Sequence, residues 1–309
     1  MKLSYAIERY VSRRHLDGVR FSNGERALVN LLRKTGDCPL HSVTGLQVTS
    51  YLQEPRTSSA TWWAKYRVLK TFFSYWMMRG ELPMLPMPRP RPAYPSPFKP
   101  LVYSKPDLQR LLEVIASNRK TGSWRLEPIT LRTVLLFLYG TGALINETLF
   151  LTERDVDLRD DLVTLHREGA LGKRTIPIGP SLHNSISLYL AFSRDRRRPG
   201  AGLFIDKEGQ SLTALTLSYA FKRVRRIAAI HLKDGKHLAS LKDFRHTFAV
   251  HCLNRWINEE KDLRQMLPAL AAYMGHVKWS WTEQYLSSTP ERFWKQLSRL
   301  GLARSLDAS

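Results

Sequence analysis

The chain has 309 residues, enough for two domains of ordinary size, and 43% of them are hydrophobic, so each domain can bury a core. Its 48 lysines and arginines outnumber 27 acidic residues, which gives a net charge of +21. This excess favours a polyanionic partner, nucleic acid before an anionic membrane surface. Two cysteines, Cys38 and Cys252, exclude a disulfide framework and a cysteine-based metal site, and they suit a reducing cytosol. No apolar run approaches the roughly 18 residues of a membrane span, so no membrane partner is expected.

Residues 1–82 have a helical pattern, with helices predicted at Leu3–Arg13, Asn23–Arg33, Thr44–Gln53 and Thr61–Arg79. The last is the clearest, because apolar residues recur there every three or four positions and form one stripe: Trp62, Tyr66, Leu69, Phe73 and Trp76. Packing is the favoured role of this stripe, ahead of base stacking. Arg67 and Lys70 fall on another face, where a solvated surface and phosphate contact are equal alternatives.

Eight prolines lie between Pro83 and Pro100, with arginines among them. Prolines at this density cannot continue a helix and favour extended polyproline II. We therefore predict a semi-rigid linker at 83–103, between an N-terminal domain at 1–82 and a second domain at 104–309. A proline-rich docking ligand is the less favoured alternative.

In the second domain, helices are predicted at Ser104–Ala116, Ser181–Arg198, Leu215–Ile230 and Arg292–Ser305, with an apolar segment at Leu131–Leu138 and two hairpin strands at Leu162–His166 and Lys173–Ile178. Two of these helices carry basic runs. Such runs are normally solvated, but in a chain of this charge they are also candidate phosphate contacts without sequence specificity. The candidates are Arg194, Arg196, Arg197, Arg198, Lys222 and Arg225.

Three short motifs close the chain: L-K-D-F-R-H-T-F-A at 241–249, M-G-H at 274–276, and Tyr285, nine residues after His276. In order and spacing they resemble the tyrosine recombinase (phage integrase) family. The Y-L-S-S-T-P-E ending resembles its transposon-type integrase branch.

The resemblance implies a mainly α fold with a small β-sheet: an N-terminal helical core-binding bundle that clasps DNA, followed by an α+β catalytic domain. Family members cut DNA through a 3′-phosphotyrosyl link and release a 5′-hydroxyl, with no cofactor, neither metal nor ATP. The implied partners are double-stranded DNA and other recombinase protomers, in a homo- or hetero-oligomer. The implied location is the bacterial cytoplasm, on the nucleoid when bound to DNA.

Carried over by position, Tyr285 is the nucleophile, Arg245 the second phosphate-clamping arginine and His276 the late histidine. Lys242 stands where the family usually has a histidine. A tyrosine with a pKa of about 10 needs neighbours that place it and stabilise charge on the phosphate. Arginine suits that role because its planar fork holds two phosphate oxygens and keeps its charge.

Two family positions have lost their chemistry. In T-G-A-L-I-N-E, at 141–147, the first catalytic arginine falls on Leu144, and the hairpin lysine falls on Gly169. Arg167 and Lys173 lie nearby. Lys173 is the candidate substitute, although a solvated turn residue is its favoured role.

Three functions follow from the sequence. The first is a recombinase or integrase of a mobile element, acting alone or as one subunit of a mixed assembly. The second is a catalytically impaired relative that binds DNA as an accessory protein. The third is a general basic nucleic-acid binder.

Overall fold

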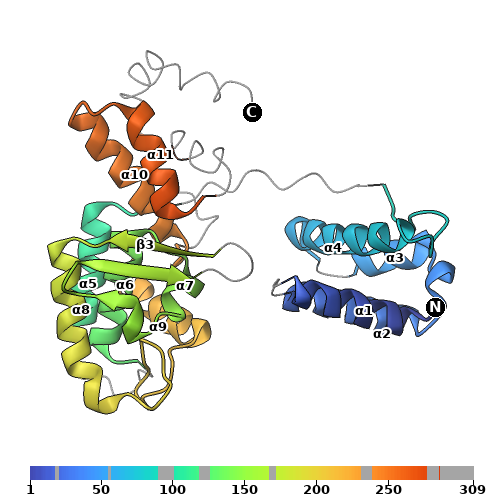
Figure 1. Ribbon diagram of the computed structural model, residues 1–309, viewed down its shortest axis with the longest axis horizontal. Coiled ribbons are helices and arrows are strands. Elements are labelled where there is room, and N and C mark those ends of the chain that lie inside the picture. Colours follow the sequence, from blue (N-terminus) through green and yellow to red (C-terminus); the bar gives the residue numbers. More distant parts are fainter. Residues whose placement is uncertain are drawn as a thin grey trace. The chain divides into compact units, whose positions relative to one another are not determined.

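The computed structural model describes residues 1–17, 21–54, 57–89, 101–117, 126–166, 172–230, 239–276 and Tyr285. The chain forms two compact units, one within residues 1–99 and one beginning at Pro100 (Figure 1). Most of the predicted linker and the predicted final helix lie outside the described residues, and the predicted domain boundaries remain predictions. Within the described ranges, no helix has the length and apolar character that a membrane crossing would require.

The first unit is built from helices α1 (Leu3–Leu16), α2 (Ser22–Thr35), α3 (Gly45–Leu52) and α4 (Ser59–Met77), with a short 3₁₀ turn η1 (Leu40–Ser42). Helix α2 packs against the other three. Side-chain caps define where α3 and α4 begin, because the hydroxyl groups of Thr44 and Ser58 accept backbone N–H groups of the first turns.

The aromatic stripe of α4 faces the core of this unit. Trp62, Tyr66, Leu69, Phe73 and Trp76 are all buried, which confirms packing as their role. Arg67 and Lys70 are exposed on the same helix. The long helix therefore has one face that holds the bundle together and one that is open to solvent.

The second unit contains α5 (Lys105–Ser117), α6 (Pro128–Thr141), α7 (Ile145–Leu149), α8 (Pro180–Ser193), α9 (Ala214–Ile227), α10 (Asp243–Asn258) and α11 (Leu263–Met274), the 3₁₀ turns η2 (Glu153–Asp155) and η3 (Arg194–Arg196), and strands β1 (Val156–Asp157), β2 (Leu162–His166) and β3 (Lys173–Pro177). Helices predominate and one small sheet is present, so the predicted fold class is confirmed.

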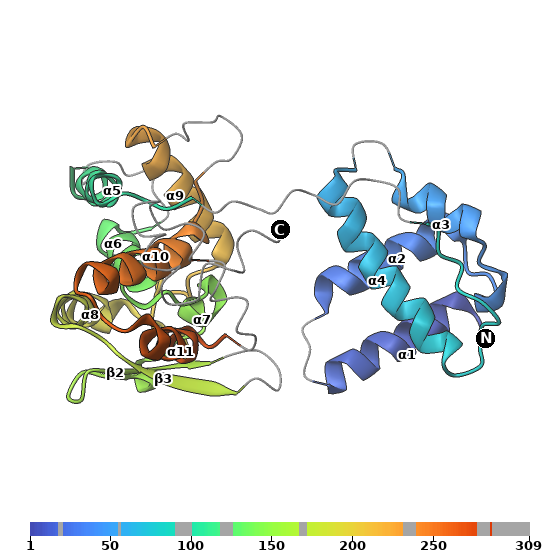
Figure 2. The same cartoon turned by 90° about the horizontal axis from the view of Figure 1, so that it is seen from above.

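The three strands form an antiparallel sheet in the order β1-β2-β3, with Leu162 opposite Pro177 and His166 opposite Lys173. Val163, Leu165 and Ile176 are buried, whereas their neighbours along the strands are less so, as expected for a sheet with one covered face. Figure 2 shows the helices of this unit on one side of the sheet.

Helix α6 lies at the centre of the second unit, packed against α5, α7, α8, α9 and α10. Its buried side chains include Leu131, Val134, Phe137 and Leu138, which are distributed around the helix rather than along one stripe. The helix ends at Gly142, whose left-handed backbone (φ +60°) is a common helix stop. The core thereby fixes the turn that joins α6 to α7.

Candidate active site

Arg245 lies in the first turn of α10, and its side chain is only 9% exposed. Its Nη1 donates to the Gly142 carbonyl at 2.6 Å, and its Nη2 donates to the Met274 carbonyl at 2.7 Å. These carbonyls end α6 and α11, where intrahelical partners are missing and the helix dipole is negative. The guanidinium group therefore joins two helix ends and is held in one place by them.

Tyr285 is 2% exposed and lies against two imidazole rings. The ring of His276 stacks on it at 5.8 Å between centroids, and the ring of His246 meets it edge-on at 5.4 Å. Burial raises the pKa of Tyr285, against the opposing charge and hydrogen bond of Arg245. The structure thus brings together three of the predicted catalytic residues, Tyr285, Arg245 and His276, and keeps the phenol protonated.

His246 is not among the predicted site residues, although it follows Arg245 directly in the motif. Burial lowers the pKa of His246; Asp243 opposes this shift and Arg245 adds to it. A neutral ring therefore contacts Tyr285 on this side. The only signal in the sequence is the R-H pair itself, which does not reveal the ring contact.

A second arginine, Arg174 of β3, joins the same part of the unit. Its two Nη atoms donate in parallel to the Glu147 carboxylate, at 2.6 and 2.9 Å, and its Nε donates to the Tyr273 carbonyl at 2.9 Å. Glu147 also accepts the backbone N–H of Leu144 at 2.8 Å. Neither Glu147 nor Arg174 is among the predicted site residues.

Two glycines are required at the turns that hold these contacts. Gly142 and Gly275 both have positive φ, at +60° and +67°, which side chains rarely adopt. A Cβ at Gly142 would lie 2.5 Å from the Phe248 ring, and one at Gly275 would lie 3.1 Å from the Arg174 side chain. Glycine therefore permits both the backbone conformation and the close approach.

The departures from the family pattern are placed as follows. Leu144 is 40% exposed at the start of α7, two residues after the Gly142 carbonyl that holds Arg245. Lys242 is exposed immediately before α10, and Lys173 is exposed at the first position of β3. Gly169 and Arg167 lie outside the described residues. The roles of Lys242, at the usual histidine position, and of Lys173, as substitute for the hairpin lysine, remain predictions.

The candidate phosphate contacts differ in their surroundings. Lys222 is exposed, whereas Arg225 is half-buried and donates to the Ala239 carbonyl at 2.5 Å. Arg194 and Arg198 are exposed, and Arg196, also exposed, lies over the Phe192 ring.

Arg197 packs inside the unit. It donates to the Ser193 hydroxyl and the Leu203 carbonyl and pairs with Glu153. Its guanidinium group thus supports the α8 end structurally, which the basic run did not indicate.

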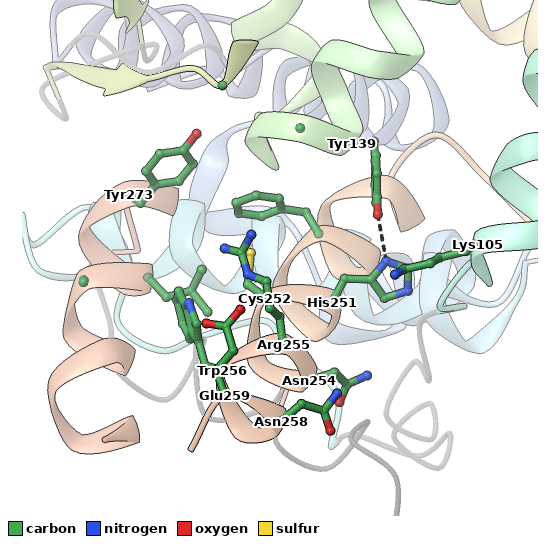
Figure 3. Close-up of a pocket in the computed structure, with 15 residues that line it drawn as sticks. Lys105, Tyr139, His251, Cys252, Asn254, Arg255, Trp256, Asn258, Glu259 and Tyr273 are labelled. Atoms are coloured by element: carbon green, nitrogen blue, oxygen red, sulfur yellow. Dashed lines mark hydrogen bonds between the residues drawn. The ribbon is translucent and has the colours of Figure 1, made fainter. Parts of the chain in front are cut away.

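A cavity of about 850 Å³ lies beside α10 and α11 in the same unit (Figure 3). Its walls include Phe248, Arg255 and Tyr273, and the Tyr139 hydroxyl meets Nδ1 of His251 at 3.0 Å on one side. None of the described residues that line it is Arg245, His276 or Tyr285. It is therefore separate from the cluster around Tyr285.

A mostly helical unit with a small antiparallel sheet and a Tyr–Arg–His cluster around a buried tyrosine is the architecture of a tyrosine recombinase catalytic domain. The model of the phage integrase family matches residues 104–292, more than half of the chain. The chain therefore belongs to the phage integrase family, as its motifs predict.

Individual relatives agree with this assignment. The chain is 27% identical over 302 residues to a putative integrase/recombinase, y4rB, of Sinorhizobium fredii (strain NBRC 101917 / NGR234), covering 96% of both chains. It is 25% identical over 254 residues to the tyrosine recombinase XerC of Staphylococcus saprophyticus, covering 80% of this chain and 77% of XerC.

Solved structures show the same fold. The Tn1549 transposon integrase in complex with transposon right end DNA matches with a TM-score of 0.69 and 18% identity, over 97% of this chain and 100% of the other. A lambda integrase dimer bound to a core site matches with a TM-score of 0.66 and 15% identity, over 90% and 96%.

Proposed function

We propose that this protein is a site-specific DNA recombinase that cuts and rejoins double-stranded DNA through Tyr285, in the integration or transposition of a mobile element. The observation that carries the proposal is the convergence of the buried Tyr285 and Arg245 with the half-buried His276 in one cluster. Membership of the phage integrase family supports it. The similarity to the Tn1549 transposon integrase supports the mobile-element role.

In the proposed reaction, the Tyr285 oxygen attacks phosphorus and loses its proton, and the bond from phosphorus to the 5′-oxygen breaks. The 5′-oxygen takes a proton and leaves as a hydroxyl, and the 3′-phosphate stays on the tyrosine. Rejoining reverses these steps with a second 5′-hydroxyl. Arg245 stabilises the charge on the phosphate, and a phosphate oxygen replaces the phenol as the acceptor of its hydrogen bond.

The free protein holds the nucleophile in a protonated, buried state, so DNA binding must precede activation. A tyrosine that is 2% exposed cannot reach a phosphodiester without rearrangement of its surroundings. A local change that exposes the phenol, and so releases the Arg245 hydrogen bond to it for a phosphate oxygen, is therefore part of the proposal.

A second candidate function is DNA binding without turnover, as an accessory protein on the same DNA. It is favoured by Leu144, whose side chain cannot bind a phosphate where the family has an arginine. Loss of one transition-state donor commonly costs about 10²- to 10³-fold in rate. A mixed assembly, in which other recombinase protomers bring intact sites, would reconcile the two candidates.

Covalent trapping on a nicked suicide substrate tests the proposal. We expect a protein–DNA adduct that resists denaturant and is abolished by Tyr285→Phe, with DNA affinity unchanged. If no adduct forms with partner recombinases present, the cleavage function is wrong. A footprint at defined inverted sites would then favour the accessory function, and binding without such a footprint would favour a general nucleic-acid binder.

A further inference from the structure

Arg174 lies on the covered face of the sheet. It occupies the second position of β3, two residues before the buried Ile176, and side chains two apart along a strand point to the same face. Its side chain is 14% exposed. A charge placed towards a core is costly unless it is paired and hydrogen-bonded, so the partners of Arg174 determine what it does.

Arg174 has strong contacts with these partners. The guanidinium fork meets both oxygens of Glu147, a carboxylate that is only 3% exposed. Burial raises the pKa of Glu147, but the hydrogen bonds from Arg174 and from the Leu144 backbone outweigh it and hold the pKa below its usual value. Glu147 is therefore ionised, and the bidentate pair fixes the orientation of both side chains.

On one side, Arg174 reaches the segment that delivers His276. Its Nε binds the Tyr273 carbonyl near the end of α11, and its side chain fills the space against Gly275. The next residue is His276, whose backbone N–H donates to the Ala271 carbonyl at 2.9 Å. Arg174 thus supports the turn immediately before the imidazole that stacks on Tyr285.

On the other side, Arg174 acts through Glu147 on the turn that holds Arg245. The Glu147 carboxylate binds the Leu144 backbone N–H, and the Gly142 carbonyl in the same turn accepts from Arg245. Arg245 also binds the Met274 carbonyl. The same two turns are therefore joined twice, once by Arg245 alone and once by Arg174 with Glu147.

We infer that Arg174, together with Glu147, is a positioning pair that sets the His276 imidazole and the Arg245 guanidinium for attack by Tyr285. The inference rests on the proposed function for its catalytic consequence, but the geometry it describes belongs to the free protein. Arg174 acts through these residues rather than through DNA, because its Nε and both Nη atoms are bonded to Tyr273 and Glu147. Lysine cannot replace it, because an ammonium group has no planar fork for a carboxylate and a carbonyl together.

The test compares Arg174→Lys with Tyr189→Phe in the full chain. Tyr189 is buried elsewhere in the unit and its hydroxyl accepts the Ile205 N–H, so its loss costs stability without touching the site. The first readout is the His276 ring resonance by NMR without DNA, with His183 and His41 as internal references. Arg174→Lys should shift the His276 resonance alone, and Tyr189→Phe should leave all three in place.

The second readout is the rate of Tyr285 adduct formation on the nicked substrate. Arg174→Lys should slow it about 10- to 100-fold, by analogy with the loss of residues that orient metal ligands. DNA affinity should stay within about 2-fold, a difference well below 1.4 kcal/mol, because the Arg174 guanidinium group is bonded to Glu147 and Tyr273. Tyr189→Phe should leave the rate unchanged below its melting temperature.

Glu147→Gln is the second variant in case Arg174→Lys does not fold. It keeps one acceptor oxygen and should shift the same resonance. An unmoved His276 resonance in the folded variants, or a rate loss no greater than that of Tyr189→Phe, would overturn the inference. If the wild-type protein forms no adduct, the NMR comparison still decides the positioning, and the failure then belongs to the proposed cleavage function alone.

Discussion

Arg245 serves the fold and the proposed chemistry with the same group. Its two Nη atoms hold the Gly142 and Met274 carbonyls, and its charge opposes the rise in the Tyr285 pKa that burial causes. A residue with both functions couples stability to activity, so its replacement should affect the two together. The other residues of the cluster, by contrast, can be tested for one property at a time.

Arg245→Lys should reduce both the stability of the protein and its activity. A lysine cannot reach both carbonyls, so we expect about 3 kcal/mol less stability in denaturant unfolding, and adduct formation at least about 10²-fold slower. The matched control is Arg110→Lys, because Arg110 is half-exposed and pairs with Asp107 on the surface. A stable Arg245→Lys protein would contradict the role of the two carbonyl contacts.

Leu144→Arg should restore a phosphate donor to the site. The position is 40% exposed and its backbone is already fixed by Glu147, so stability should change by no more than about 0.5 kcal/mol. Adduct formation should rise by up to about 10²-fold. Leu144→Gln, polar but uncharged, is the control. The absence of any gain would count against the alignment of Leu144 with the missing arginine.

Two half-buried histidines should make the protein sensitive to acid. Burial lowers the pKa of His246, and burial together with Lys105 lowers that of His251. In the unfolded chain both titrate near pH 6.5, so as the pH falls the unfolded state binds protons first. Their contribution to stability is full above about pH 6.5 and is lost as the pH falls towards the folded pKa values.

We expect the melting temperature to fall by several degrees between about pH 7.5 and pH 5.5. His251→Phe should weaken this dependence, and replacement of the exposed His41 by glutamine should not. A melting temperature that does not vary over this range would show that the two rings are not held neutral.

At the scale of elements, periodicity predicts amphipathic helices well and central ones poorly. The helix predicted at Thr61–Arg79 is α4, Ser59–Met77, because its apolar and polar faces differ. The segment predicted at Leu131–Leu138 is only the middle of α6, Pro128–Thr141, because a helix buried on most of its surface has little polar face to mark its ends. The helix predicted at Ser181–Arg198 ends at Ser193, where a 3₁₀ turn begins.

The candidate site likewise contains residues that the sequence predicts and residues that it does not. The motifs and their spacing predict that Arg245, His276 and Tyr285 belong together, and the structure places them together. The Arg174–Glu147 pair could not be predicted, since it joins a strand to a helix 27 positions away. Sequence periodicity describes one element at a time and carries no information on which elements meet.

Gly275→Ala should damage the turn that carries His276 in two ways. Positive φ strains any side chain, at a cost of about 1 to 3 kcal/mol, and the new Cβ would displace Arg174. Gly200→Ala is the control, since Gly200 has φ +78° with nothing within 4 Å of its Cβ position. Unfolding should show the strain in both variants. Slower adduct formation should appear in Gly275→Ala alone, and equal rates would contradict the Arg174 contact.

At the scale of the whole molecule, two units with separate cores share a chain of net charge +21. Binding of DNA by such a chain should depend steeply on salt, because each neutralised phosphate releases counterions. Exposed cations on the first unit would then contribute to affinity even though the proposed chemistry belongs to the second.

The double variant Arg67→Gln, Lys70→Gln should weaken DNA binding evenly across sequences. If both side chains contact phosphates, the slope of log affinity against log salt should fall by about 2. Lys65→Gln on the same helix is the control, because Lys65 is paired with Glu54 at 2.6 Å. An unchanged slope would assign Arg67 and Lys70 to a solvated surface. The measurement is fluorescence anisotropy over a salt series.

The two hydrogen bonds between Arg245 and the helix ends also affect how the catalytic residues of such proteins are lost in evolution. A descendant that no longer cut DNA would still need this arginine to keep α6 and α11 together, whereas an exposed position such as Leu144 could change at little cost. The presence of Arg245 is therefore only weak evidence that the protein is catalytically active. We expect inactive homologues that have lost the nucleophilic tyrosine to keep an arginine at the position of Arg245. A set of such homologues without this arginine would contradict the expectation that the tyrosine is lost first.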